Sequence, residues 1–209
     1  MSHFTVLVVT AVEPTDSVLA EVLAPFVEEV GPGDQYAVWN DCTQEVEEGF
    51  EEHPTKRLEH SADMFPFKPW PEYATLEEYA KGWFAYSKNA AGRWGYFHNP
   101  NAKWDGWQLG GRWAGSLEIK KGAAGVSGWG ESPAGQFDAA KVADLVTDLA
   151  AEPQYAILAV DGAWHERGQM GWFGIASNEQ SPEQWAGEYS KFIAAIDPAH
   201  WVAVVDCHI

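Results

Sequence analysis

The chain has 209 residues, 46% of them hydrophobic, and a formal net charge of −18 at pH 7. This length and apolar content are enough for one sizeable core, so we expect a single domain. The negative charge opposes binding to a nucleic-acid backbone, and no patch of Lys and Arg offsets it. No apolar run approaches the roughly 20 residues that a membrane span needs. We therefore expect neither nucleic acid nor a membrane as partner.

Cys42 and Cys207 are the only cysteines. Two thiols do not make a disulfide framework, and a reduced compartment is the simplest interpretation. The first residues, MSHFTV, lack the basic segment and the cleavage site of a secretory signal. The sequence thus predicts a cytoplasmic protein, or one in the host cytoplasm if a phage encodes it. It implies no cofactor, leaves a divalent metal open, and does not indicate an oligomeric state.

The N-terminal part begins with a continuous apolar, β-branched run at residues 4–9, which predicts a central strand covered on both faces. Asp16 is predicted to cap the helix that follows, and Pro25 to end or kink it. The acidic run at residues 45–52 is typical of a solvated helix face. Residues 65–71 hold three prolines and three aromatic residues, which excludes regular structure.

The remainder alternates predicted helices and strands. A capping box at residues 75–78 predicts a helix to about Ser87, and Asp138 is expected to cap another. The best helix signal starts at Ser181, where Pro182 occupies the first position and Gln184 completes a capping box. Residues 161–162, Asp-Gly, predict a hairpin turn. Strands are expected at residues 116–120, 155–160, 170–176 and 201–205.

This order of elements predicts an α+β fold, with a mainly antiparallel sheet and helices on one face. We expect a ferredoxin-like core within one domain of residues 1–209. Residues 31–135 would form a large insertion that carries the most polar and aromatic segment of the chain.

That segment, residues 99–113, is called here the central motif. It combines three tryptophans, two cations, two asparagines and a Gly-Gly step. Indole faces offer stacking surface, an Arg fork suits phosphate or carboxylate, and glycines let a backbone approach a ligand. The motif therefore predicts a site for a planar, anionic small molecule. The expected ligand-binding residues are Asn99, Asn101, Lys103, Trp104, Asp105, Trp107, Gly110, Gly111, Arg112 and Trp113, together with Trp172.

Other roles remain open for several of these residues. Arg112 could pair with one of the many acids or stack on Trp113. Asn99 and Asn101 could each build a turn around Pro100 instead of binding a ligand.

A second candidate site lies where the two ends of the chain would meet. Adjacent, antiparallel first and last strands would place His3 beside Asp206 and His208, which alternation puts on one face. Two imidazoles and a carboxylate suit a metal or acid–base catalysis, and Glu166 is a further candidate catalytic carboxylate. Cys207 would point the other way, as a small buried side chain. Half-exposed histidines at a sheet edge are the alternative.

His3 and Thr5 also match the H-x-[ST] pattern of two-histidine phosphoesterases, and the only second copy is at residues 53–55. No phosphate-binding P-loop, dinucleotide fingerprint, zinc-finger spacing or G-x-S-x-G elbow is present. Their absence disfavours the common nucleotide-hydrolysing and dehydrogenase classes.

Five segments spread across the chain carry a family resemblance. They are HFTVLV at residues 3–8, NPNAKWD at 99–105, GGRW at 110–113, GQMGW at 168–172 and VDCHI at 205–209. Together they resemble a family of uncharacterised proteins encoded by tailed bacteriophages and some bacteria. That family has an aromatic pair after the Asp, whereas Gly106 takes the first place here. The resemblance implies a phage-associated context and no particular activity; phage accessory proteins of this size are often counter-defence factors.

We weigh three functions on this basis. The favoured one is an accessory protein that binds a small anionic, nucleotide-like ligand and sequesters an immune signal. The alternative is a phosphodiester or nucleotide hydrolase that uses His3, Asp206 and His208, with or without a divalent metal. The third is an acidic inhibitor of a host protein.

Overall fold

The computed structural model describes residues 2–63, 71–171 and 174–209, with the side chains of residues 55 and 57–63 left out. The chain divides into two compact units. Unit 1 comprises Met1–Glu28 and Asn101–Ile209, and unit 2 comprises Glu29–Pro100. Unit 2 begins close to the expected start of the insertion at residue 31. It ends before residues 101–135, which belong to unit 1 because two of their strands pair in its sheet.

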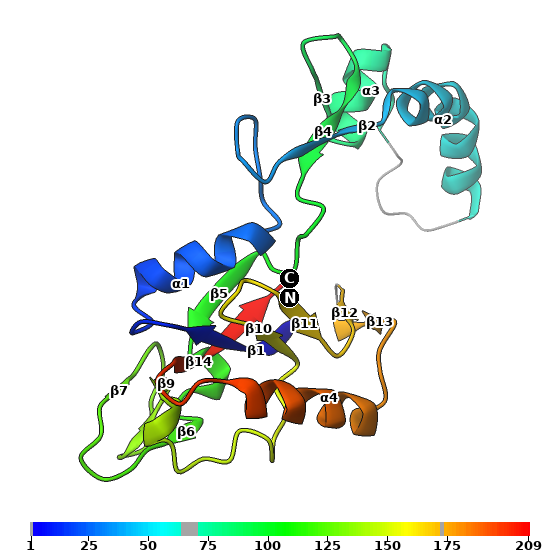
Figure 1. Ribbon diagram of the computed structural model, residues 1–209. Coiled ribbons are helices and arrows are strands. Elements are labelled where there is room, and N and C mark those ends of the chain that lie inside the picture. The colour runs from blue at the N-terminus through cyan, green and yellow to red at the C-terminus, as the bar shows by residue number, and fades with distance from the viewer. Residues whose placement is uncertain (1, 64–70, 172–173) are drawn as a thin grey trace. The chain divides into compact units, whose positions relative to one another are not determined.

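Unit 1 is built on a mixed sheet in which the described residues form seven strands (Figure 1). The order is β11-β10-β1-β14-β9-β7, and β5 pairs with β14 beside β9. The strands are β1 (His3–Thr10), β5 (Gly106–Leu109), β7 (Gly125–Val126), β9 (Ala139–Lys141), β10 (Ala156–Leu158), β11 (Trp164–Glu166) and β14 (Trp201–His208). Only the β1–β10 pair is parallel within this sheet. The predicted α+β class is therefore confirmed.

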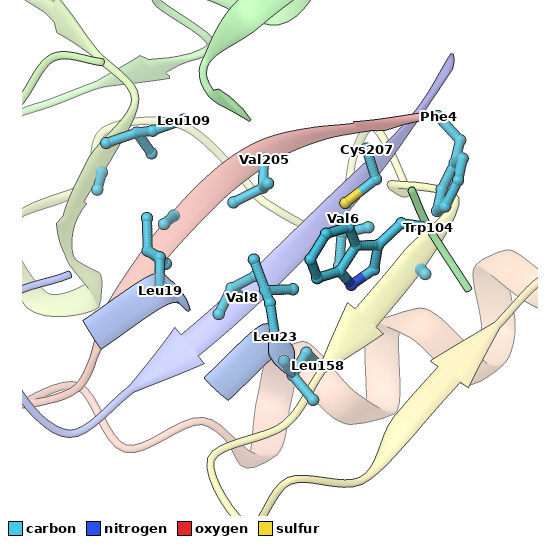
Figure 2. Packing of buried hydrophobic residues seen from close by; sticks show 13 residues of the cluster. Phe4, Val6, Val8, Leu19, Leu23, Trp104, Leu109, Leu158, Val205 and Cys207 are labelled. Atoms are coloured by element: carbon cyan, nitrogen blue, oxygen red, sulfur yellow. The ribbon is translucent and has the colours of Figure 1, made fainter. Parts of the chain in front are cut away.

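Alternation along β1 gives the sheet two buried faces. Val6 and Val8 contact α1 (Asp16–Leu23) in one core, which Figure 2 shows, whereas Leu7 and Val9 belong to a second core with α4 (Pro182–Ala195). The expected central strand is confirmed. The expectation that the helices lie on one face is wrong, because α1 and α4 cover opposite faces (Figure 1). The run at residues 4–9 is apolar at every position except Thr5 because both faces are covered.

The ferredoxin-like order is not shown. In a split βαβ unit another strand lies between the two parallel strands. Here β10 pairs directly with β1, from Val6↔Ala156 to Val8↔Leu158, and β11 lies outside β10 as its hairpin partner. The predicted neighbours β1 and β14 are confirmed, with eight antiparallel residue pairs.

Some of the helix caps, turns and helices predicted in unit 1 are confirmed and others are wrong. Ser181 caps α4 through the expected reciprocal capping box, and the turn at Gly162 closes the β10–β11 hairpin. The cap of α1 is Thr15 rather than Asp16, since the Thr15 side chain accepts from the Val18 N–H. The helix expected after Asp138 is wrong, because β9 and the short 3-10 helix η3 (Val142–Asp144) occupy that stretch.

The smaller elements of unit 1 connect these strands. Two 3-10 helices, η1 (Ala24–Phe26) and η2 (Gly111–Trp113), follow α1 and β5. Four short strands form two separate antiparallel pairs. β6 (Leu117–Glu118) pairs with β8 (Gln136–Phe137), and β12 (Gln169–Met170) pairs with β13 (Ala176–Ser177).

Unit 2 combines two helices with a three-stranded sheet of order β2-β4-β3. Its elements are β2 (Val38–Asp41), α2 (Thr43–Asp63), α3 (Leu76–Trp83), β3 (Ser87–Lys88) and β4 (Trp94–His98). Its core gathers Val46, Tyr79, Ala80 and Trp94. The predicted helix after Thr75 is confirmed but ends at Trp83, before Ser87. The run predicted to be irregular at residues 65–71 lies almost wholly outside the described residues.

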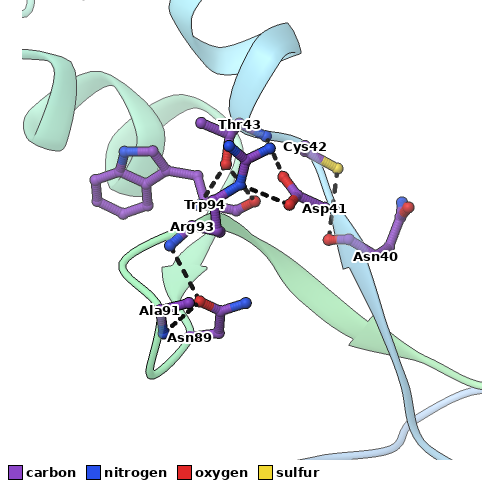
Figure 3. A network of polar contacts seen from close by, with 8 residues as sticks. All are labelled: Asn40, Asp41, Cys42, Thr43, Asn89, Ala91, Arg93 and Trp94. Atoms are coloured by element: carbon purple, nitrogen blue, oxygen red, sulfur yellow. Dashed lines mark hydrogen bonds and ion pairs between the residues drawn. The ribbon is translucent and has the colours of Figure 1, made fainter.

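A polar network joins the start of α2 to β4 (Figure 3). The Asp41 carboxylate accepts from the Thr43 N–H at 3.0 Å and from Arg93 Nε at 2.8 Å. The Arg93 hydrogen bond lowers the pKa of Asp41 to about 2. The Thr43 hydroxyl accepts from the Trp94 N–H at 2.9 Å. These contacts cap the helix and tie it to the sheet of unit 2.

In the described part of the chain, no helix combines the length and the apolar character that crossing a membrane requires.

Candidate functional site

Two histidines and two aspartates meet at one end of the unit 1 sheet, and we call them the His–Asp cluster: His3, Asp105, Asp206 and His208. His3 and His208 are cross-strand partners on β1 and β14. Their ring centroids lie 5.3 Å apart, with the planes inclined at 42°. His3 Nδ1 lies 2.8 Å from Asp206 Oδ1. The structure thus brings together the three residues that alternation placed on one face.

Asp206 is the buried member of the cluster, with 3% of its surface exposed. Its Oδ1 faces His3, and its Oδ2 accepts from the Arg112 backbone N–H at 3.0 Å. Gly111 makes this approach possible: a Cβ there would lie 2.6 Å from Asp206 Oδ2, and its φ is +54°. Both oxygens are therefore occupied by donors, which fixes the carboxylate and, through it, the His3 ring.

His208 has a carboxylate of its own. Asp105 Oδ1 lies 2.5 Å from His208 Nδ1, although the angle makes no hydrogen bond. The Asp105 N–H donates to the His208 carbonyl at 2.8 Å, which aligns the two residues. Gly106 leaves room for the ring, because a Cβ there would lie 2.3 Å from His208 Nε2. Each imidazole of the cluster therefore stands beside one carboxylate.

The Arg112 backbone contacts the cluster. Asp206 accepts from its N–H, and the Arg112 side chain is exposed. In the described ranges the Arg112 side chain forms no ion pair. It is thus available to an anion from solvent.

The described residues contain no group of three or more His, Cys, Asp or Glu side chains placed to hold a metal ion. Cys207 lies on the α1 face, fully buried in the core with Val205, and burial raises the pKa of its thiol. The expectation that it points away from Asp206 and His208 is confirmed.

Glu166 does not join the cluster. It pairs with Ala156, which pairs with Val6, and Val6 faces α1. His3 has the opposite parity on β1, so Glu166 lies on the other face of the sheet. Its two oxygens accept from Lys103 Nζ at 2.6 Å and from Trp164 Nε1 at 2.8 Å. Glu166 therefore lies apart from the His–Asp cluster, and its carboxylate is paired with Lys103.

The tryptophans of the central motif do not line one cavity. Trp104 is 7% exposed and belongs to the core on the α1 face (Figure 2). Trp107 packs against that same core, whereas Trp113 packs against the core on the α4 face. The structure therefore does not bring these three tryptophans together, since the sheet separates Trp113 from the other two. Trp172 lies outside the described residues.

Two carboxylates of the protein pack against the Gly-Gly step at residues 110–111. A Cβ at Gly110 would lie 2.6 Å from Asp138 Cγ, as one at Gly111 would crowd Asp206. Asp138 is 1% exposed and accepts from the N–H groups of Gly115 and Gly128, both at 2.6 Å. The N–H groups of Gly110 and Gly111 donate to the carbonyls of Val204 and Trp129. The sequence suggested that the Gly110 and Gly111 N–H groups could bind a ligand, whereas in the structure both donate to carbonyls of the protein.

The two asparagines of the motif fall on either side of the unit boundary. Asn99 is buried in unit 2, and Asn101 is exposed in unit 1. The second H-x-[ST] copy also lies in unit 2, on α2, where His53 is buried and its Nε2 lies 2.8 Å from the Pro71 carbonyl. Because α2 is a helix, this copy lacks the strand context of residues 3–5.

Two cavities open on the α4 face and were not expected from sequence. One of about 440 Å³ is lined by Thr5 and Arg167, and one of about 370 Å³ by Trp113 and Val204; Gln154 lines both. Alternation on β1 places Thr5 on the same face as His3, and this was the available signal. No sequence signal placed Arg167 at the cavity, because its place in the lining depends on how the β10–β11 hairpin pairs.

Unit 2 has a larger cavity, of about 730 Å³, with several carboxylates in its lining. Glu52 lies 2.5 Å from Lys56 Nζ, and Glu48 accepts from the Gln44 amide at 2.8 Å. Asp41 is held by Arg93. Since these three acids have partners within the protein, we assign them no catalytic role.

No family model matches the chain, and no curated protein or solved structure is significantly similar to it. The function is therefore argued from the geometry of the site alone.

Proposed function

We propose that the protein hydrolyses a phosphodiester or a related nucleotide by acid–base catalysis at the His–Asp cluster. The observation that carries this proposal is the pair of imidazoles at 5.3 Å, each beside a carboxylate. Two positioned imidazoles can take a proton from an attacking group and give one to a leaving group. Arg112 supplies positive charge next to them in a molecule of net charge −18.

The contacts assign different tasks to the two rings. Asp206 accepts at Oδ1 from His3 Nδ1–H, which leaves the Nε2 lone pair of His3 free to act as base. His3 removes a proton from water as the water oxygen bonds to phosphorus. The bond from phosphorus to the leaving oxygen breaks, and protonated His208, beside Asp105, donates a proton to that oxygen. Arg112 binds the non-bridging oxygens, whose charge grows in the transition state.

Turnover of bis-p-nitrophenyl phosphate and of linear and cyclic dinucleotides tests this proposal. His208→Ala and His3→Gln should each lower kcat by about 100-fold or more, the range of general acid–base catalysis. His200→Ala, at a half-buried histidine outside the cluster, is the matched control. Equal activity of His208→Ala and wild type, both folded, would remove the proposal.

A second function uses the same ligand chemistry without turnover. A phage-type accessory protein that sequesters a nucleotide immune signal needs an anion-binding group, and the exposed Arg112 side chain supports this candidate. Calorimetric titration with the same nucleotides separates the two functions. Binding that Arg112→Gln weakens, with no hydrolysis by wild type at any pH, would favour sequestration over catalysis.

A further inference from the structure

The cavity of about 440 Å³ on the α4 face lies next to the His–Asp cluster. Thr5 lines it and is the cross-strand partner of Asp206. Thr5 also lies two residues from His3 on the same face of β1, which corresponds to about 7 Å along a strand. A ligand whose phosphate contacts the cluster can therefore reach this cavity with the group that the phosphate carries.

The walls of the cavity are mostly apolar and aromatic. Trp185 is 3% exposed, and its indole N–H donates to the Gln154 carbonyl at 2.8 Å, which fixes the ring. Tyr155 is fixed as well, because its hydroxyl donates to the Gly168 carbonyl at 2.9 Å and its ring packs edge-on against Phe4 of the core on the α1 face. Pro153, Pro182 and Ala186 add further apolar lining, and a mostly apolar cavity suits an uncharged organic group rather than a hydrated ion.

Arg167 is the cation in the lining of this cavity. Its Nε is buried and makes no hydrogen bond within the described residues, although Glu179 Oε1 lies 3.3 Å away. The nearby carboxylate offsets the charge of the guanidinium, so a second phosphate gains little here. The buried Nε–H of Arg167 has no acceptor among the described residues, and a buried unpaired N–H is costly.

We propose that this cavity is the nucleobase subsite of the nucleotide site, with Arg167 donating to acceptor atoms of the base. The inference rests on the proposed function, because it places the phosphate of the same ligand at the His–Asp cluster. Arg recognises guanine through the adjacent O6 and N7 acceptors, and guanine is therefore the base used for the test. Arg167 is a binding residue in this scheme and takes no part in proton transfer.

Calorimetric titration with GMP, guanosine and ribose 5-phosphate tests the subsite. Ala186 lines the cavity on α4, so Ala186→Phe should fill it; Ala194→Phe, at an exposed position on the same helix, is the control. Ala186→Phe should weaken GMP and guanosine at least tenfold and leave ribose 5-phosphate unchanged. Arg167→Gln should weaken GMP about tenfold, one lost hydrogen bond to a charged donor.

The ligands separate the two proposals. If guanosine binds and Ala186→Phe blocks it while Arg112→Gln and His208→Ala affect no ligand, the base subsite stands and the phosphate site fails. If Ala186→Phe and Ala194→Phe bind GMP as wild type does, the subsite is refuted. Failure of folded wild-type protein to bind GMP and guanosine also refutes it.

Discussion

Replacing Asp206 by Asn tests how the His–Asp cluster works, because the change keeps the shape of the side chain and removes its charge. The carboxylate accepts two hydrogen bonds, from His3 at 2.8 Å and from the Arg112 N–H at 3.0 Å. An amide has one oxygen, which the fixed Arg112 N–H needs. Its NH2 group must therefore face His3 Nδ1, which can accept only in the tautomer that carries its proton on Nε2. That tautomer has no lone pair left for the base.

The expected magnitudes follow from these contacts. Hydrogen bonds to a charged group contribute about 1.5–3 kcal/mol each, and neutral ones about 0.5–1.5. Turning two charged hydrogen bonds into neutral ones at a residue that is 3% exposed should lower the free energy of unfolding by about 2 kcal/mol. Turnover should fall about 1000-fold or more, because a comparable change in a serine protease triad traps the wrong tautomer.

Urea unfolding followed by tryptophan fluorescence measures the first quantity, and hydrolysis of a dinucleotide the second. Asp197→Asn is the control, since that exposed carboxylate also accepts a backbone N–H, from Ala199 at 2.8 Å. It should lose about 0.5 kcal/mol or less and no turnover. A folded Asp206→Asn variant with more than half of wild-type turnover would refute the assignment of His3 as base.

Three further outcomes are expected. Gly111→Ala should lower the free energy of unfolding by about 2 kcal/mol or more, and Gly162→Ala by about 1 in the same urea experiment, because both φ angles are positive but only Gly111 would also crowd Asp206; equal losses would contradict this. Glu166→Gln should leave turnover within twofold of wild type, since Glu166 lies on the other face of the sheet, and a 100-fold loss would contradict that placement. Burial raises the pKa of Cys207 above 9.0 and that of Tyr189 from 10.0 to about 12. As pH rises, the unfolded chain therefore loses these protons before the folded protein does. The free energy of unfolding, measured by urea titration, should be full below about pH 9 and fall as pH rises towards 12. A free energy of unfolding that stays constant over this range would contradict this.

The sequence predicted the meeting of the chain ends because the signal was local to each strand. Residues 4–9 and 201–205 are apolar runs, and period-2 alternation then assigns each polar neighbour to a face. The face of Glu166 needed the register between β10 and β11, and that of β10 on β1. No local pattern encodes such a register, so the same reasoning failed there.

The misreading of Asp138 has a chemical cause. An Asp that caps a helix and an Asp that closes a loop both accept backbone N–H groups. The donors of Asp138 are Gly115 and Gly128, from separate loops, rather than the next residues in the chain. Trp104 was misread for a similar reason: a polar, glycine-rich neighbourhood in sequence surrounds a side chain that the fold buries at 7% exposure.

The contacts of the central motif differ from those that its composition suggested. Gly110 and Gly111 let the turn that begins at Gly110 pass over two buried carboxylates, Asp138 and Asp206. The first holds the loops against the sheet, and the second links the Arg112 backbone to His3. A larger residue at Gly111 would therefore displace Asp206, and with it the link between the Arg112 backbone and His3. The Asp206 carboxylate thus connects the motif to both ends of the chain, because it lies on β14 and contacts both the Arg112 N–H and His3 on β1.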